Sequence, residues 1–336
     1  MGSHLVIAPG SINVDLILKT ESLKGPKTFR GTYSESQGGK GSNQAIAAKR
    51  SAARGHRAVH LVGCVGDDAW GAESLKILNQ TGVGTAHVRV DESVRTGLVM
   101  EYLYGDGEVT IALDLGANAH VCPDDIDTAG QLIDSAALLL TQIENPLAAL
   151  ENAVTRAADA GVPAMLDPSV VPESDTERQH LFDAILPRLD IIAPNRSEAL
   201  ALTGVEIIDD ETALAAATAL RQHVGIVLIT RGADGALIAR DDDHHFVRGL
   251  FVDAIDGGAA GDTFRGAWAL ALVEQLEQAA CPLAELPFEA LVAATRFANA
   301  AAALCVTRVG AAPAIPHRAD IDVLLSDSAQ FREAAS

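Results

Sequence analysis

Residues 256–264 read Asp-Gly-Gly-Ala-Ala-Gly-Asp-Thr-Phe and precede an apolar pattern over residues 263–276 that predicts a helix. The first N–H groups of a helix have no internal partner and favour an anion, so a phosphate could bind at Ala260, Gly261 and Asp262. The Asp262 carboxylate would repel that phosphate unless it takes a proton from a hydroxyl that attacks it. The same residues would also suit a small-residue turn in which an Asp caps the helix.

A second glycine-rich helix start occupies residues 38–45, Gly-Gly-Lys-Gly-Ser-Asn-Gln-Ala. It is not a P-loop, because Gly41 follows the Gly-Lys pair where that motif needs Ser or Thr. Lys40 and Asn43 could donate hydrogen bonds to a polyhydroxylated or charged ligand. The alternative is a solvated loop that only begins a helix.

The composition narrows the class of protein. The chain has 336 residues, 48% of them hydrophobic, which suffices for one large or two modest domains. Its net charge of -20 argues against a nucleic acid or an anionic membrane as main partner. Cys64, Cys122, Cys281 and Cys305 form no C-x-x-C pair, so we expect reduced thiols in a cytoplasmic protein. We see no signal peptide and no apolar run of membrane-spanning length.

Strand and helix patterns alternate regularly from residue 137, which predicts a mostly parallel sheet with right-handed crossovers. The expected strands are 137–142, 162–166, 189–193, 225–230, 235–240 and 244–252. The expected helices are 146–160, 175–186, 196–203 and 210–223, and helices 262–279 and 287–304 close the chain.

The first part of the chain is less regular. Strands are expected at 5–8 and 60–65, and a helix at 68–80. Residues 85–90, 96–103 and 109–113 are strand-like and look like hairpins around a turn at 105–107. We expect a small separate sheet, such as a lid, formed by about residues 16–37 and 96–113.

Polar residues cluster just after the predicted strands. They are Asn13 and Asp15, Glu144 and Asn145, Asp167, Asn195 and Glu198, and Thr230, Arg231 and Gly232. One such residue is usually a cap, but several on one edge of a parallel sheet predict a binding cleft.

Residues 38–45 and 256–264 are similar to the two signature sequences of the ribokinase-like (PfkB) carbohydrate kinases, and the chain resembles the ribokinase branch of that family over residues 5–325. Residues 10–15, 116–119 and 194–198 share the resemblance. It implies an α/β fold, the ribokinase-like three-layer α/β/α arrangement with a mostly parallel central sheet and a small β-sheet lid. It also implies one kinase domain over residues 5–330.

The resemblance implies ATP-dependent phosphorylation of the 5-hydroxyl of D-ribose. Asp262 would be the base, and the N–H groups of Ala260, Gly261 and Asp262 would hold the developing charge. Ala259 would belong to the same catalytic segment. The sugar-binding residues would be Asn13, Asp15, Gly39, Lys40, Asn43 and Glu144, with Asp262.

The resemblance also implies binding sites for a nucleotide and for two ions. Asn195 and Glu198 would order Mg²⁺ and phosphate through water. The remaining nucleotide positions would be Thr230, Arg231, Gly232, Ala233, Asp234, Gly235, Gly261 and Asn299. A K⁺ site would involve Asp256, Gly258, Cys305, Arg308, Gly310 and Ala314, mostly through backbone carbonyls.

The chain departs from the family pattern at a few positions. Gly257 stands where Thr is usual, and Ala259 where Gly is frequent. Asp167 stands where ribokinases tend to have Asn, and Arg231 where a less charged residue is common. These departures bear on the fit of substrate, nucleotide and cation.

Two kinds of alternative function remain: other kinases of the same family, and proteins without kinase activity. A nucleoside kinase of the adenosine or inosine type, or another sugar kinase of the family, would use the same framework. A non-catalytic sugar sensor should lack the base, and a dinucleotide-dependent dehydrogenase should have G-x-G-x-x-G after its first strand. Exposed sheet edges on the lid lead us to expect a homodimer through the lid.

Overall fold

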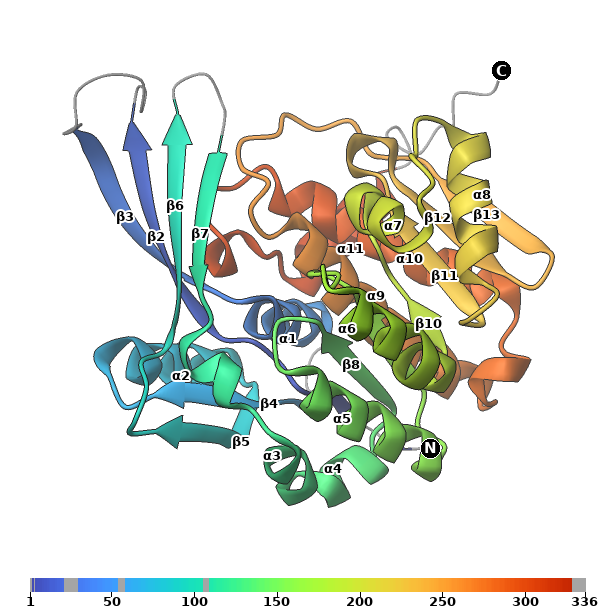
Figure 1. Cartoon of the computed structure of the whole chain (residues 1–336). Coiled ribbons are helices and arrows are strands. Elements are labelled where there is room, and N and C mark those ends of the chain that lie inside the picture. Colours follow the sequence, from blue (N-terminus) through green and yellow to red (C-terminus); the bar gives the residue numbers. More distant parts are fainter. Residues whose placement is uncertain (1, 3, 21–29, 54–57, 105–108, 328–336) are drawn as a thin grey trace.

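The computed structural model describes residues 2, 4–20, 30–53, 58–104 and 109–327, and these residues form two β-sheets (Figure 1). The larger sheet has nine strands in the spatial order β13-β12-β11-β10-β9-β8-β1-β4-β5. They are β1 (His4–Ile7), β4 (Ala58–Gly66), β5 (Gly84–Asp91), β8 (Leu138–Gln142), β9 (Ala164–Asp167), β10 (Ile191–Ile192), β11 (Ile226–Thr230), β12 (Ala236–Arg240) and β13 (Asp243–Val247). All pairings from β11 to β5 are parallel, and only β12 and β13 are antiparallel.

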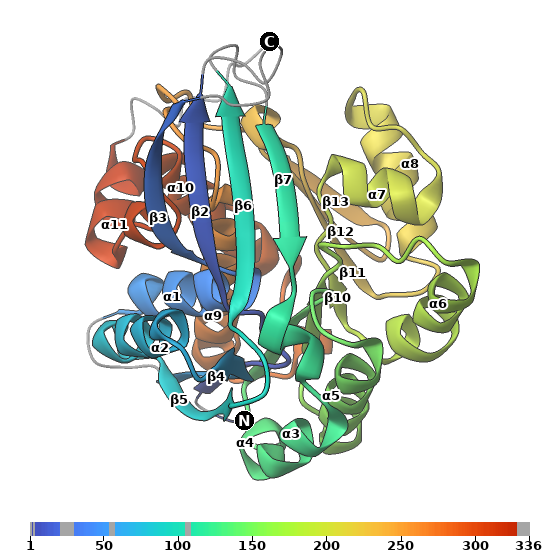
Figure 2. The same ribbon diagram turned by 60° about the vertical axis from the view of Figure 1, so that its left-hand side comes forward.

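Helices cover both faces of this sheet, so the main body has three layers (Figures 1 and 2). One apolar core lies beneath α1 (Lys40–Ser51), α2 (Ala69–Thr81), α9 (Ala260–Ala279), α10 (Phe288–Cys305) and α11 (Arg318–Ser326). The other lies beneath α3 (Pro123–Thr128), α4 (Gly130–Asp134), α5 (Leu147–Ala160), α7 (Arg196–Thr203) and α8 (Asp210–Leu220). The short helix α6 (Asp175–His180) buries none of its own residues. In β1, Leu5 and Ile7 enter the first core while Val6 enters the second, as alternation in a strand buried on both faces requires.

The smaller sheet stands apart from the main body (Figure 2). Its strands are β2 (Asn13–Thr20), β3 (Gly31–Gly38), β6 (Gly97–Tyr104) and β7 (Val109–Asp114), in the order β3-β2-β6-β7. A small separate sheet from these two parts of the chain is therefore confirmed. Residues 21–29 and 105–108, which include the predicted turn at 105–107, lie outside the described residues.

Several sequence predictions are wrong in detail. Residues 85–90 do not form a hairpin with the strands that follow them, because β5 pairs in parallel with β4 at the edge of the large sheet. The strand predicted over 244–252 ends at Val247, since Val247 pairs with Ala236, the first residue of β12, and the chain turns before it at Gly235 with φ 90°.

Helix predictions need correction as well. The helix predicted over 175–186 is α6 followed by a π-turn at Leu181–Ile185, and α8 ends at Leu220. The short helices α3 and α4 were not predicted, and α11 closes the described chain after α10.

The expectation of no membrane-spanning run also needs correction, because α10 is long and apolar enough by length and composition. However, 61% of that helix is buried, against α9 and the sheet, so the apolar face is used inside the fold.

Helices α1 and α9 cross at very close range, which decides where their first turns lie. A Cβ on Gly266 of α9 would be 2.3 Å from the Gln44 carbonyl oxygen and 2.8 Å from the Ala47 Cβ of α1. Only glycine permits this approach of backbone to backbone. The crossing brings the start of α1 beside the start of α9.

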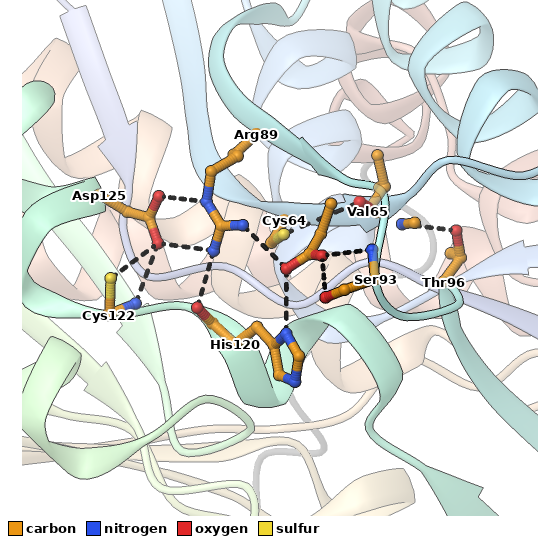
Figure 3. A network of polar contacts seen from close by, with 10 residues as sticks. Cys64, Val65, Arg89, Ser93, Thr96, His120, Cys122 and Asp125 are labelled. Carbon is orange, nitrogen blue, oxygen red and sulfur yellow. Dashed lines mark hydrogen bonds and ion pairs between the residues drawn. The ribbon is translucent and has the colours of Figure 1, made fainter.

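A polar network fixes the base of the small sheet (Figure 3). Arg89 on β5 binds Asp125 of α3 at 2.7 Å and donates to the His120 carbonyl at 2.7 Å. His120 also contacts Asp91, with 3.0 Å between Nδ1 and the carboxylate. Thr96, at the entry to β6, accepts the Gly66 N–H at 3.0 Å. The network therefore anchors the short helix at Gly116–His120, through which the chain leaves β7 for the main body.

Candidate active site

The order of the strands in the main sheet reverses at β1. On one side of β1 the chain adds β4 and β5, and on the other side it adds β8 and the strands that follow. Ligands of open α/β sheets bind outside the carboxyl ends of the strands at such a point. A cleft of roughly 1510 Å³ opens there, between this edge and the small sheet. Its lining includes all the predicted sugar-binding residues, namely Asn13, Asp15, Gly39, Lys40, Asn43, Glu144 and Asp262.

Asp262 lies in the first turn of α9 and is 6% exposed. Two amides of α1 hold its carboxylate: Asn43 donates to Oδ2 at 3.0 Å, and Gln44 donates to Oδ1 at 3.2 Å. Burial raises the pKa of Asp262, and the nearby charge of Lys40 opposes part of the rise. The Asn43 Oδ1 atom has no partner in the described part of the chain, so it is available to a ligand hydroxyl.

The predicted anion site has fewer free N–H groups than the sequence predicted. Ala260 donates its N–H to the Gly257 carbonyl at 3.2 Å, so that group is already used in a turn. In the described residues the N–H groups of Gly261 and Asp262 make no hydrogen bond. Ala259 is the N-cap residue of α9 and is buried. Two free N–H groups at a helix start still suit a phosphate oxygen.

Lys40 and Gly39 begin α1 at the floor of the cleft. Gly39 has φ 89°, a left-handed conformation that favours glycine, and a Cβ there would lie 2.6 Å from the Asn13 nitrogen. Burial alone would lower the pKa of Lys40, but the carboxylates around it, first Asp262, outweigh burial and raise it. Lys40 is therefore a permanent positive charge among acids.

Two predicted sugar ligands are oriented by residues that the sequence analysis did not place in the site. Asn118 donates to Asn13 Oδ1 at 2.7 Å and accepts the Ile12 N–H at 2.9 Å. Ser11 donates to the Glu144 carboxylate at 2.6 Å. Burial raises the pKa of Glu144, and Lys40 opposes the rise. Ser11 and Asn118 lie in the segments 10–15 and 116–119 that share the family resemblance, so that resemblance was a usable signal.

Asp15, on the cleft face of β2, is a second acid of the site whose pKa is raised. Burial is the main cause that raises its pKa to about 7, followed by the charge of Glu101 on the neighbouring strand β6. The charges of Asp262 and Glu144 act in the same direction.

A buried charge cluster behind Asp262 was also missed. Asp167, 0% exposed, accepts from Gln44 at 2.7 Å and lies 3.2 Å from Arg265 Nε. Arg265 also binds Glu198 at 2.9 Å. The signal available in the sequence was Arg265 itself, a charged residue within an apolar helix pattern. The sequence predicted Asp167 at the edge of the cleft and noted it as a departure from the family pattern, but it gave no indication of its contact with Arg265.

The predicted nucleotide residues lie at the carboxyl ends of β10 and β11, where Asn195 and Thr230 form an isolated bridge. Asn195 caps α7 and accepts the Glu198 N–H at 2.9 Å, while Glu198 accepts the Asn195 N–H at 2.7 Å. Burial raises the pKa of Glu198, and the Arg265 charge opposes it. Because both Glu198 oxygens already accept hydrogen bonds, the residue suits a water-bridged metal better than a directly bound one.

The loop between β11 and β12 holds the other predicted nucleotide residues, Gly232, Ala233, Asp234 and Gly235. The Arg231 side chain is buried within the fold: it is 4% exposed, binds Asp210 at 2.6 Å and lies 5.3 Å from the Phe246 ring centre. Its charge is used inside the fold, so only its backbone is available. Asn299 of α10 donates to the Arg248 carbonyl at 2.7 Å.

The residues predicted for K⁺ come from two loops that Asp256 joins. Its carboxylate accepts the N–H groups of Gly258 and Gly310, each at 2.9 Å. Cys305 and Ala314 pack in a small apolar cluster with Ala259. The Arg308 side chain binds Asp320 of α11 at 3.0 Å, so only its carbonyl could serve a cation. A carboxylate beside two loops rich in carbonyls is a donor set that fits K⁺.

The pKa of Asp15 predicts a specific change of stability with pH. Between its ordinary value of 3.8 and about 7, the folded state holds the proton more tightly than the unfolded state. The free energy of unfolding therefore falls as pH rises through this window. Asp15→Asn lacks this contribution, so its stability advantage over the wild type should grow from pH 4 to pH 7 and then stay level. Urea unfolding across this range measures it.

The matched comparison is Asp253→Asn, which changes an exposed carboxylate outside the cleft. A difference between Asp15→Asn and the wild type that does not change with pH would contradict the assignment of the raised pKa of Asp15.

Comparison with known proteins identifies the family. The family model described as pfkB family carbohydrate kinase matches residues 3–318. A ribokinase of Haemophilus influenzae is 35% identical over 312 residues, covering 92% of this chain and 94% of that protein. A ribokinase structure from Giardia lamblia has a TM-score of 0.88 at 28% identity, with 97% of this chain and 99% of that one covered. An Arabidopsis thaliana ribokinase solved with ribose and ATP has a TM-score of 0.81 at 27% identity, with the same coverage. The chain belongs to the pfkB family of carbohydrate kinases.

Proposed function

We propose that this chain is a sugar kinase that transfers the terminal phosphoryl group of ATP to the 5-hydroxyl of D-ribose, giving ribose 5-phosphate. One observation carries the proposal: a buried carboxylate, Asp262, lies at a helix N-terminus inside a polar cleft, held by two amides. A base beside an anion site suits attack of a hydroxyl on a phosphate. The ribokinases among its relatives, one solved with ribose and ATP, support ribose as the acceptor.

The chemistry follows from the geometry. Asp262 takes the proton of the sugar hydroxyl, whose oxygen bonds to the terminal phosphorus while the bond to the ADP oxygen breaks. Asn43 and Gln44 fix the carboxylate so that a free lone pair remains for that proton. The N–H groups of Gly261 and Asp262, with Lys40, stabilise charge on the transferred group. Acceptors such as Asp15 and Glu144 bind sugar hydroxyls and disfavour analogues that lack them.

Two ions belong to the proposal. Mg²⁺ would neutralise phosphate charge, ordered through water by Asn195 and Glu198. K⁺ would act structurally between the loop of Asp256 and the loop that contains Gly310. It would hold the turn before α9 so that its N–H groups face the phosphate before the reaction begins.

We propose the small sheet as a lid over the cleft, within one kinase domain over residues 5–330. We also propose a homodimer through that lid, because β3 and β7 are unpaired edges in the described sheet and Tyr33 is 55% exposed there. Sedimentation at micromolar concentration distinguishes dimer from monomer. The four free cysteines support a cytoplasmic location.

A competition assay tests the function. Ribose and inosine are supplied together with ATP and Mg²⁺, and the products are identified by ³¹P NMR. Ribose 5-phosphate should be the main product, because the relatives of this chain are ribokinases and Asn13, Asp15 and Glu144 line the cleft. Phosphorylation of inosine with ribose inert would contradict the proposal in favour of a nucleoside kinase.

Potassium should raise turnover well above the rate in Na⁺ or tetramethylammonium at equal ionic strength, with ATP and Mg²⁺ saturating. Asp256→Ala should remove most of that difference, because the carboxylate joins the two loops. Asp253→Ala, in the same loop segment but exposed, should keep it. Equal wild-type rates in all three salts would show that these loops do not use the cation.

A further inference from the structure

Glu101 is an acid in the cleft to which no role has been given. Strand alternation places Val99, Glu101 and Leu103 of β6 on the face that lines the cleft. The residues paired with Glu101 on the neighbouring strands are Ile17 of β2 and Ile111 of β7. Glu101 is thus a carboxylate with apolar side chains directly beside it on the inner face of the small sheet, while Asp15 and Lys19 of β2 lie diagonally across from it on the same face.

The Glu101 carboxylate is not satisfied within the described residues. It is half-buried, and it forms no hydrogen bond or ion pair with any residue in the part of the chain that the structure describes. Burial and then the charge of Asp256 raise its pKa. A carboxylate held among apolar groups without a donor is costly unless a ligand provides one.

Asp15 is the nearest acid of the sugar site on the same sheet face. It pairs with Val99, and Glu101 lies two residues further along β6. The spacing of strands and residues places their Cα atoms roughly 8 Å apart. Among the nearby charges that raise the pKa of Asp15, the charge of Glu101 has the largest effect. Two acids that face one cleft from adjacent strands can accept hydrogen bonds from different hydroxyls of one sugar ring.

We propose that Glu101 is a specificity-determining residue of the acceptor site. Its carboxylate accepts a hydrogen bond from a ring hydroxyl of the bound sugar, on the side of the small sheet and away from the hydroxyl that Asp262 deprotonates. The inference rests on the proposed function and extends it to the choice between sugars. A sugar without that hydroxyl leaves Glu101 unpaired among Ile17, Val99 and Ile111, so the cleft discriminates against it.

The proximity of Asp256 suggests another role, in which Glu101 acts only on the cation loops. The two roles differ in what they change. A ligand of the sugar alters the preference between sugars, whereas a residue of the cation site alters the response to K⁺. Both are measured in the same set of variants.

The test compares wild type, Glu101→Leu and Glu101→Gln, with Glu35→Gln as control, since Glu35 is an exposed acid of β3 outside the cleft. For each, kcat/KM is measured with D-ribose and with its 1-deoxy, 2-deoxy and 3-deoxy analogues, in K⁺ and in Na⁺. Thermal melts verify that the variants are folded.

Glu101→Leu should lower kcat/KM for ribose about tenfold, mainly through KM, which is the loss of one hydrogen bond to a charged group. Its preference for ribose should fall by a similar factor against one deoxy analogue, which identifies the hydroxyl. Glu101→Gln should show a smaller fall against the same analogue, and Glu35→Gln none. If Glu101→Leu does not fold, the Gln variant decides by the same ratio.

Unchanged preferences against all three analogues would overturn the role of Glu101, as would a loss of the K⁺ response alone. A wild type that phosphorylates none of these sugars would instead refute the proposed function. The two failures are distinct, because the second is seen without any variant.

Discussion

The structure depends on holding one carboxylate, Asp262, in a buried position at the start of α9. Burial makes a charged acid costly, so it needs donors that are already oriented. Asn43 and Gln44 provide them from α1 at 3.0 and 3.2 Å. They reach it because Gly266 lets the two helices cross in backbone contact. A carboxylate fixed in this way suits the proposed role of Asp262 as the base, because it would need little reorganisation when the hydroxyl proton moves.

Buried ion pairs connect Asp262 to the other acids of the site. Asp262, Asp167 and Glu198 are neutralised mainly by Lys40 and Arg265. Arg265 contacts both Asp167, behind the sugar cleft, and Glu198, at the proposed nucleotide side. The two halves of the site therefore share one buried ion network. Because removing one partner of a buried pair leaves an unpaired charge, the halves cannot vary independently.

Much of the fold followed from the sequence because the relevant signals are local. The alternation of strands and helices predicted β8 to β11, and the glycine-rich segments predicted the starts of α1 and α9. The location of β5 could not be predicted, since a half-exposed strand fits either sheet and only its pairing with β4 decides. Gln44 and Asp167 are 123 residues apart, so no spacing in the sequence indicates their contact. The inward turn of Arg231 likewise depends on Asp210 and Phe246, which fold against it from elsewhere.

The most direct measurement of the central claim is the single-turnover rate of phosphoryl transfer in Asp262→Asn, measured by rapid quench with ATP and sugar saturating. Asparagine keeps the shape and can remain bonded to α1, but it cannot take a proton. The account predicts ATP binding and stability close to wild type, with transfer slowed ~10²–10⁴-fold. Asp253→Asn, in the exposed part of the preceding loop, should transfer at the normal rate. Transfer at the wild-type rate in Asp262→Asn would contradict the account, because Asp262 would then not be the base.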